Sequence, residues 1–441
     1  MFEKSCREQW GKKLPAEKLS AISLVLVLET PPVGADSDGD NPRSTSRIEL
    51  PWNRSPFSRF RSTASPGGTN WAWLAIVGLL AVWAWRPALS LAEEWRIDAP
   101  IPRQVVQRQH FDPRKAHEHN PGGADLGRAD VLIRGHFPRL ATATMEYRVV
   151  PLEGAFGRAI DWTPARPTAK GTDDAADELR ADVPAGGWYK LEIRGRVGDK
   201  IVGQAAVEPI GVGEVLVIAG QSYADGANDE RLAIADPLGR AVSYDVANKS
   251  WQTADDPQPN SADGGTIWPP LADTLLPLAQ VPVGFVNVAV GGTSSRQWLP
   301  GEQLYQRLES AGLATGRFRA VLWQQGESDV IEKVSTGQYV KNLTAIRAAL
   351  AQAWGFEPPW LLAKSTFHPT VYNDPQHEGQ IRDAIDQLWR LPGFRPGPDT
   401  DILSGENRGG LGTRRHFTGL GQRRAALLWF AAVWPEMHRT E

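Results

Sequence analysis

The sequence predicts a three-layer α/β domain with a parallel sheet, preceded by a small β-sandwich domain. Two observations predict the α/β domain, which we expect over residues 214–438. Nearly continuous apolar runs are typical of buried parallel strands, and they alternate with segments whose apolar residues recur every three or four positions, as in amphipathic helices. Such alternation indicates helices on both faces of one sheet. The runs are EVLVIAG, VGFVNVAVGG, FRAVLWQQG and PPWLLAKST, and the helical segments include 336–355 and 378–391.

The region before this domain, residues 97–210, has a different pattern. Short segments that alternate or are rich in β-branched residues are divided by Gly, Pro and Asp clusters such as PAGG. This spacing is typical of short strands joined by turns. No helical period of useful length is present, so we expect a β-sandwich here. The segments are VLIRGHF, MEYRVV, WYKLEIRGRV and KIVGQAAVEPI.

The pattern of residues in the N-terminal part predicts an export signal. Residues 71–85, WAWLAIVGLLAVWAW, are fifteen consecutive apolar or small residues that follow three arginines and precede the small residue Ala92. A basic segment, an apolar segment and a small-residue site together predict a signal peptide over 71–92. The alternative is an uncleaved membrane anchor, although a spanning helix needs about 20 residues. Residues 1–70 are expected to be disordered or to reflect a start codon assigned too early. The protein is then periplasmic or extracellular.

Composition excludes several classes of function. The chain has 441 residues, which predicts two or three domains at about 150 residues each. A formal net charge of −3 gives no basic footprint, so we expect no nucleic-acid partner. One cysteine, Cys6, leaves no thiol cluster for a metal, and the histidines 110, 117 and 119 lie in a polar loop without further ligands. We therefore expect no metal and no cofactor.

Residues suited to acyl transfer follow several of the predicted strands. Ser222 comes directly after the first strand, the pair Gly291-Gly292 after the second, and Gln325 with Glu327 after the third, while His416 precedes the last helix. The carboxyl ends of parallel strands meet at one edge of a sheet, where sites in such domains lie. A serine activated by an imidazole, with backbone and amide donors nearby, can attack a carbonyl and stabilise the resulting oxyanion.

Four fragments in this order resemble the SGNH-type hydrolases: AGQSYADG, VAVGGTSSRQW, WQQGESD and the C-terminal HF-x-x-x-G. The resemblance covers residues 214–435. Within the SGNH-type hydrolases, the chain more closely resembles the branch of carbohydrate acetylesterases that includes sialate O-acetylesterase and certain acetylxylan esterases. This resemblance implies a carboxylic ester hydrolase that removes O-acetyl groups from a sugar. A small β-domain before the hydrolase domain also occurs in that family.

The resemblance also implies roles for single residues. Ser222 would be the nucleophile and His416 the general base. The backbone N–H groups of Ser222 and Gly292 and the side-chain amide of Gln325 would form the oxyanion hole. We also expect three residues near the site to contact the substrate: Gln221, Trp298 and His368.

The acid of the triad is missing from its usual place. The family often has an aspartate three residues before the histidine, and this chain has Thr413 there. A threonine cannot stabilise an imidazolium electrostatically. Glu327 is the favoured substitute, because some relatives use a glutamate in this motif, and Asp401 or Glu406 are alternatives. A serine–histidine pair without an acid is a further possibility.

Two other interpretations of the chain stay open. Ser222 can also act as a helix N-cap after a strand, and a chain that has lost its acid would be a non-catalytic carbohydrate-binding or cell-envelope protein. A simple esterase for acyl esters is the other alternative.

The family usually has asparagine after the serine, whereas this chain has Tyr223; we expect this change to alter local packing.

Overall fold

A computed structural model describes residues 94–114, 125–138, 141–168, 177–409 and 415–439. The predictions for residues 1–70 and 71–92, and those for His117, His119 and Thr413, lie outside the described residues. Within the described part of the chain, no helix is long and apolar enough to cross a membrane.

The first part of the described chain is built from two packed sheets. One sheet has the order β1-β3-β7-β6, and in the other β4 pairs with β5 and β8, and β8 pairs with β9. In β3 the residues alternate between exposed and buried, and the buried side chains Val131 and Ile133 share a core with Leu191 and Ile193 of β8. This arrangement confirms the β-sandwich. The strands are β1 (Arg96–Ala99), β3 (Arg128–His136), β4 (Thr144–Pro151), β5 (Ile160–Pro164), β6 (Arg166–Pro167), β7 (Asp177–Pro184), β8 (Gly187–Val197) and β9 (Lys200–Gly220).

Strand β9 continues into the second part of the chain, where it is the central strand of a mostly parallel sheet. Its second half pairs in parallel with β12 and β13, and the full order is β11-β10-β12-β9-β13-β14-β15. Only β11 runs antiparallel to its neighbour on this path. The short β2 (Val105–Gln107) also pairs with β9. The other strands are β10 (Ala241–Asp245), β11 (Ser250–Thr253), β12 (Val283–Asn287), β13 (Ala320–Gln324), β14 (Trp360–Lys364) and β15 (Phe394–Asp399).

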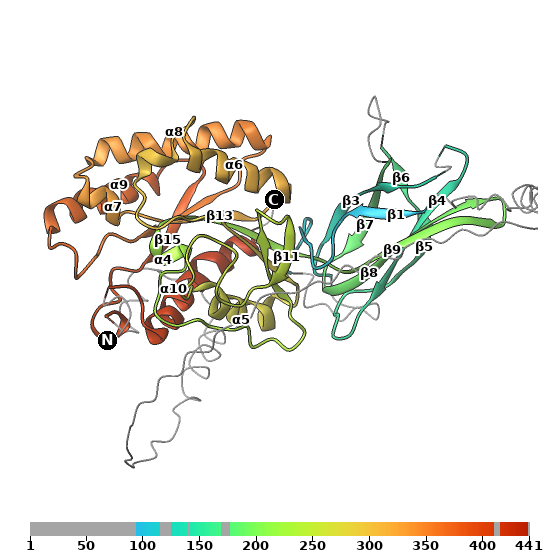
Figure 1. Ribbon diagram of the computed structural model, residues 1–441, viewed down its shortest axis with the longest axis horizontal. Coiled ribbons are helices and arrows are strands. Elements are labelled where there is room, and N and C mark those ends of the chain that lie inside the picture. Colours follow the sequence, from blue (N-terminus) through green and yellow to red (C-terminus); the bar gives the residue numbers. More distant parts are fainter. Residues whose placement is uncertain (1–93, 115–124, 139–140, 169–176, 410–414, 440–441) are drawn as a thin grey trace, which may run out of the picture. The chain divides into compact units, whose positions relative to one another are not determined.

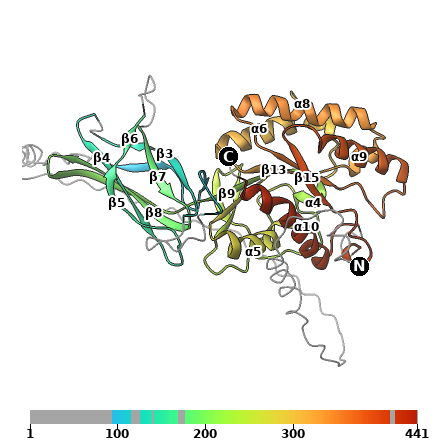
Figure 2. The same cartoon turned by 180° about the vertical axis from the view of Figure 1, so that it is seen from behind.

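Helices cover both faces of this parallel sheet. Figures 1 and 2 show α6, α8 and α9 on one face and α5 and α10 on the other. The predicted three-layer α/β arrangement is therefore confirmed. The helices are α4 (Ser222–Asp225), α5 (Trp268–Ala279), α6 (Gln303–Thr315), α7 (Glu327–Ile331), α8 (Thr336–Trp354), α9 (Pro375–Leu388) and α10 (Gly419–Met437), with 3₁₀ turns η1 (Ser295–Trp298) and η2 (Gly405–Asn407).

Capping residues set the ends of the long helices. Helix α8 starts after Ser335, whose hydroxyl accepts a hydrogen bond from the N–H of Gln338, and it stops at Gly355 in the left-handed conformation. Both devices satisfy backbone groups that a helix end leaves unpaired. Helix α10 starts after Thr418 in the same way, which places its first residue three positions after His416.

The strand register brings the ends of the strands together. Gly220, the last residue of β9, pairs with Gln324, the last residue of β13, and Gln324 also pairs with Ala363 in β14. Asn287 at the end of β12 pairs with Ile218. Residues that follow these strands therefore emerge at one edge of the sheet.

Candidate active site

Ser222 lies at the carboxyl end of the central strand. Gly220 has a φ of +131°, and a Cβ there would lie 2.0 Å from the carbonyl oxygen of Gln324. Only glycine fits this close approach. The chain then turns into α4, and Ser222 is 8% exposed. The serine therefore lies at the strand end, and a small part of its surface is accessible.

The glycine pair of the second strand end lies directly beside this serine. A Cβ built on Gly291 would be 3.7 Å from the Cβ of Ser222. Gly292 has a φ of +71°, is exposed, and has open space where a side chain would be. The backbone of this loop can thus approach a group bound at Ser222 without obstruction.

Asp225 fixes the position of the glycine loop. Its Oδ2 accepts a hydrogen bond from the N–H of Gly291 at 2.8 Å, and its carboxylate also accepts from the hydroxyl of Ser261. The N–H of Ala262 and the amide of Asn260 donate to Oδ1. Sequence reasoning missed this residue. The only signal was a carboxylate one helical turn after the serine.

Gln325 and Gln221 connect the strand ends from the inside. The amide of Gln325 donates to the Oε1 of Gln221 at 3.3 Å and to the carbonyl of Thr293 at 3.2 Å, and it also contacts Asp329. The Oε1 of Gln221 accepts from the N–H of Ser328 at 3.1 Å. Both side chains are buried, so the expected substrate contact of Gln221 is not available in this structure. The oxyanion role of Gln325 stays a prediction. To donate to an oxyanion, the amide would have to give up its hydrogen bond to one of these acceptors.

The expectation for Trp298 is wrong in this structure. Its indole is 0% exposed and packs edge-on against Trp323 at 5.3 Å between ring centres. Its N–H donates to the hydroxyl of Thr293 at 3.1 Å. Because the ring is enclosed, it cannot stack on a sugar; it supports the Gly291-Gly292 loop from below.

His416 is held next to the helix that carries the serine. The Oδ1 of Asn228 accepts from the N–H of Phe417 at 3.2 Å, and its amide donates to the carbonyl of Tyr223 at 3.0 Å. The rings of Tyr223 and His416 meet at 4.9 Å with an interplanar angle of 70°. Burial, with help from the nearby charge of Arg415, lowers the pKa of His416 to about 3. The imidazole is therefore neutral, which is the form that accepts a proton.

His368 lies beside His416. The two imidazoles are 5.9 Å apart and nearly perpendicular, and the other face of His368 stacks on Tyr372. Burial, followed by the charge of Arg415, lowers the pKa of His368 to about 4. Its Nδ1 is buried and has no hydrogen-bond partner among the described residues. A role in substrate binding stays a prediction for this side chain.

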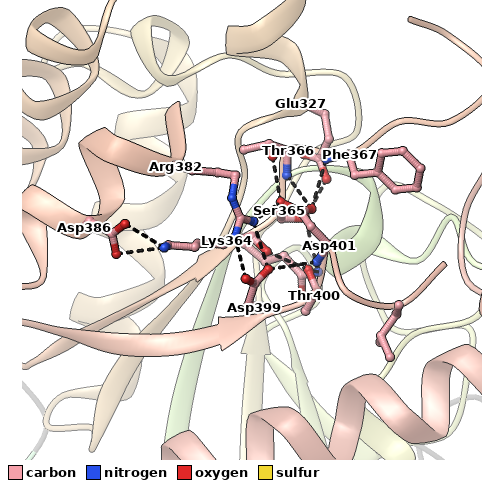
Figure 3. A network of polar contacts seen from close by, with 12 residues as sticks. Glu327, Lys364, Ser365, Thr366, Phe367, Arg382, Asp386, Asp399, Thr400 and Asp401 are labelled. Atoms are coloured by element: carbon pink, nitrogen blue, oxygen red, sulfur yellow. Dashed lines mark hydrogen bonds and ion pairs between the residues drawn. The ribbon is translucent and has the colours of Figure 1, made fainter. Parts of the chain in front are cut away.

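Glu327 is buried at the start of α7. Its Oε1 accepts a hydrogen bond from the hydroxyl of Ser365 at 2.6 Å (Figure 3). Its Oε2 has no hydrogen-bond partner among the described residues. Burial raises the pKa of Glu327 to about 8. One carboxylate oxygen is thus free to accept a further hydrogen bond, and the group is neutral over much of the ordinary pH range.

Asp401 belongs to a different network. Its Oδ1 accepts from the N–H groups of Thr366 and Phe367, and its Oδ2 accepts from the hydroxyl of Thr366 and from Arg382 at 2.7 Å. Figure 3 shows Arg382 between Asp399 and Asp401. The prediction of Asp401 as an alternative acid is therefore corrected, because both oxygens are occupied in holding the turn after β14. Glu406 likewise forms an ion pair with Arg424 at 2.6 Å.

Tyr223 replaces the asparagine of the family and has a partner of its own. Its ring is fully buried, and Arg408 places its guanidinium 4.7 Å from the ring centre and donates to the hydroxyl. The same guanidinium donates to the carbonyls of Phe367 at 3.0 Å, Thr400 at 3.0 Å and Leu403 at 2.6 Å. The change at Tyr223 thus belongs to a packing arrangement that joins three loops at the strand ends.

Metal binding receives no support in the part of the chain that the structure describes. No group of three or more His, Cys, Asp and Glu side chains there could hold an ion.

The fold is a three-layer α/β domain whose parallel strands end at one edge, where the candidate residues lie. Residues 212–367 match the family described as carbohydrate esterase, sialic acid-specific acetylesterase. The chain is 38% identical over 65 residues to a protein from Arabidopsis thaliana described as a "Probable carbohydrate esterase", a match that spans 14% of this chain and 25% of that one. The chain thus spans a quarter of the length of this curated relative.

Solved structures to which the chain is similar include a carbohydrate acetylesterase from Xanthomonas citri. It is 17% identical with a TM-score of 0.49, over 76% of this chain and 74% of that one. A protein from Arabidopsis thaliana is 20% identical with a TM-score of 0.40, over 51% of this chain and 98% of that one. The esterase EstA from Pseudoalteromonas is 12% identical with a TM-score of 0.34, over 51% of this chain and 100% of that one.

Proposed function

We propose that this protein is an esterase that removes O-acetyl groups from carbohydrate through an acetyl-serine at Ser222. One observation carries the proposal. Ser222 lies at the carboxyl end of the central strand, and the exposed Gly291-Gly292 backbone lies next to it. The family match of residues 212–367 supports the carbohydrate ester as substrate class.

The chemistry follows from the residues at this edge. The Oγ of Ser222 attacks the acetyl carbonyl carbon while a neutral His416 accepts the hydroxyl proton. The oxyanion accepts hydrogen bonds from the N–H groups of Ser222 and Gly292, and from Gln325 once its amide turns toward the substrate. As the C–O bond to the sugar breaks, His416 returns the proton to the sugar oxygen. Water then attacks the acetyl-serine with His416 again as base, which releases acetate and restores the serine.

Glu327 completes the site in this proposal. The free Oε2 can accept the N–H of an imidazole, and an ionised carboxylate there would stabilise the imidazolium that forms in each transition state. The pKa of the Tyr223 hydroxyl is raised, mainly by burial. The charge of Arg408 lowers this pKa, and the charge of the Glu327 carboxylate raises it. Tyr223 in turn contacts the ring of His416.

The test uses the purified full chain. We expect acetate release from acetylated xylan or from O-acetylated sialic acid, and we expect Ser222→Ala to abolish it. A fluorophosphonate should label the peptide that contains Ser222, and His416→Ala should suppress this labelling. Ser250→Ala, at an exposed serine on β11, serves as the control and should keep both. Full acetate release by Ser222→Ala would end the proposal.

The same measurements separate the alternatives. A faster rate on long-chain than on acetyl p-nitrophenyl esters would indicate a simple acyl-ester esterase. Binding of the glycan with no acetate release and no labelling would indicate a non-catalytic binding protein.

We further propose that the protein is exported. The pattern of residues 71–92 supports this, with a basic segment, an apolar segment and Ala92 at the cleavage position. N-terminal sequencing of protein recovered from the cell envelope and the medium tests it. A mature N-terminus at Glu93 is expected for cleavage, whereas an intact segment found only in membranes would indicate an anchor.

A further inference from the structure

The β-sandwich contains a cavity that lies on different elements from the Ser222 site. Its volume is about 500 Å³, within the range of roughly 300–1,000 Å³ that small-molecule sites occupy. Between β5 and β6 the chain crosses from one sheet to the other at Ala165, whose N–H donates to the carbonyl of Met145. The cavity lies at this crossing, because both flanking strands and both sheets contribute to its lining.

The lining has both polar and apolar surface, and the formal charges of its arginines and aspartates cancel. Arg128 and Arg166 contribute two guanidinium groups, and Asp130 and Asp182 contribute two carboxylates. Each arginine forms an ion pair across the cavity wall, Arg128 with Asp182 at 3.4 Å and Arg166 with Asp130 at 2.5 Å. All four side chains remain 41–65% exposed. They therefore keep donors and acceptors that can face a ligand.

The charged side chains form an exposed network of ion pairs on this face of the sheet. Asp130 and Asp182 are directly opposite each other in the register of β3 and β7, and arginines compensate both carboxylates. Arg166 and Arg180 pair with Asp130, and Arg128 pairs with Asp182. Exposed ion pairs of this kind each contribute about 0–1 kcal/mol to stability, so these side chains can rearrange around a ligand at little cost. Tyr147 from the other sheet also lines the cavity; its hydroxyl donates to the backbone carbonyl of Asp182 at 3.2 Å and accepts from the N–H of Asp182 at 3.3 Å.

We propose that this cavity is a second binding site, for a neutral saccharide of one or two sugar rings. Carboxylates and guanidinium groups each offer two parallel acceptors or donors, which match the paired hydroxyls of a sugar ring. The cancelling charges favour a neutral ligand over an ion. The hydroxyl of Thr163 adds a further donor and acceptor at the wall. The site needs no acetyl group on the sugar, so it stands apart from the proposed esterase activity, although a polysaccharide substrate would engage both.

The experiment is titration calorimetry of the full chain with unacetylated xylohexaose, which the esterase site cannot hydrolyse. We expect binding, and we expect Arg166→Ala to weaken it about tenfold, as removal of a charged hydrogen bond does. Arg134→Ala is the matched control: it is 54% exposed, lies on the same face of β3 as Arg128 and Asp130 and pairs with Glu178 at 2.8 Å, but does not line the cavity. It should bind as the unmodified protein does.

Three outcomes would overturn the proposal: no binding of xylohexaose, equal weakening by both substitutions, or binding of sialyllactose in its place, which would assign the cavity to an acidic sugar. Hydrolysis of p-nitrophenyl acetate by Arg166→Ala should equal that of the unmodified protein. This last measurement separates a failure of the second site from a failure of the proposed esterase function.

Discussion

The carboxylate of Asp225 accepts a hydrogen bond from the backbone N–H of Gly291 at 2.8 Å. This bond joins the helix that begins with Ser222 to the glycine loop at the end of β12. In the proposed mechanism, the distance between the nucleophile and the N–H of Gly292 depends on it. Asp225 touches neither the substrate nor the reacting atoms, so it is a positioning residue.

Replacement of Asp225 by alanine should therefore affect catalysis more than binding. We expect kcat on an acetyl ester to fall about 10²-fold with little change in KM, because loss of one oxyanion donor costs about 10²–10³ in kcat. Steady-state kinetics give both constants, and thermal unfolding gives the change in stability.

Asp256→Ala is the control for Asp225. Asp256 also holds a loop. Its carboxylate accepts hydrogen bonds from the N–H and the hydroxyl of Thr266 and from the N–H of Leu232. Burial raises the pKa of both aspartates. We expect a comparable loss of stability with kcat retained. An equal drop in kcat for both variants would show that Asp225 acts only through general stability.

Asn228 performs the corresponding task for the base. We expect Asn228→Ala to lower kcat about tenfold, because Phe417, the residue after His416, loses the acceptor of its N–H, at a cost of about 1–3 kcal/mol for a buried group. The rate at which a fluorophosphonate labels Ser222 should fall in parallel. Asn248→Ala, at an exposed asparagine that bonds only to Asp245 among the described residues, should leave both rates unchanged. Unchanged labelling in Asn228→Ala would contradict the assignment.

The sequence predicted the fold well because the patterns that specify it are local. Four apolar runs identified β9, β12, β13 and β14, since a buried parallel strand needs apolar residues on both faces. The helix predicted at 336–355 is α8, whose interior has the helical period. The helix predicted at 378–391 spans Pro375–Leu388. The predicted start is too late. Asp374 caps the helix by accepting a hydrogen bond from the N–H of His377, and the periodicity of apolar residues does not show such a side-chain contact.

The candidate site was less predictable, because its supporting contacts join distant parts of the chain. Asp225 bonds to Gly291, and Asn228 to Phe417, 189 positions away; no local pattern marks either pair. Trp298 shows the opposite limit. A tryptophan after a glycine loop suggests a sugar platform, but its contact with Trp323, which encloses the ring, depends on how η1 packs on the sheet.

Arg408 should be essential for the stability of the strand-end loops. Its guanidinium satisfies three buried backbone carbonyls and the hydroxyl of Tyr223. Arg408→Met leaves these acceptors without donors, and we expect it to lower the free energy of unfolding by about 3 kcal/mol or more. Arg408→Lys should restore little, because an ammonium cannot reproduce the planar fork.

Urea denaturation of the Arg408 variants measures this effect. Arg424→Met is the control, since Arg424 is 44% exposed and pairs with Glu406 in the neighbouring segment; its expected cost is within about 1 kcal/mol. A stability of Arg408→Met equal to that of the control would contradict the role of the guanidinium.

Glu327 should make folding stability depend on pH in an unusual direction. Burial raises the pKa of its carboxyl to about 8, above the value in the unfolded chain, so the folded state binds the proton more tightly. Its contribution is complete at low pH and is lost as the pH rises through about 8. Glu327→Gln removes this dependence, and the variant should gain stability relative to the unmodified protein between pH 5 and pH 9. Urea denaturation at both pH values measures it, with the exposed Glu357→Gln as a control that should show no such trend.

The same titration tests whether Glu327 is the acid of the triad. Only the ionised carboxylate stabilises an imidazolium, so the ratio of kcat/KM between the unmodified protein and Glu327→Gln should rise as the pH passes through about 8. At pH 9 we expect a ratio of up to about 10⁴, by analogy with the loss of the aspartate in a serine protease triad. His416, with its pKa lowered to about 3, stays neutral from pH 5 to pH 9 and does not contribute to the trend. A ratio that stays constant over this range would leave Ser222 and His416 as a pair without an acid.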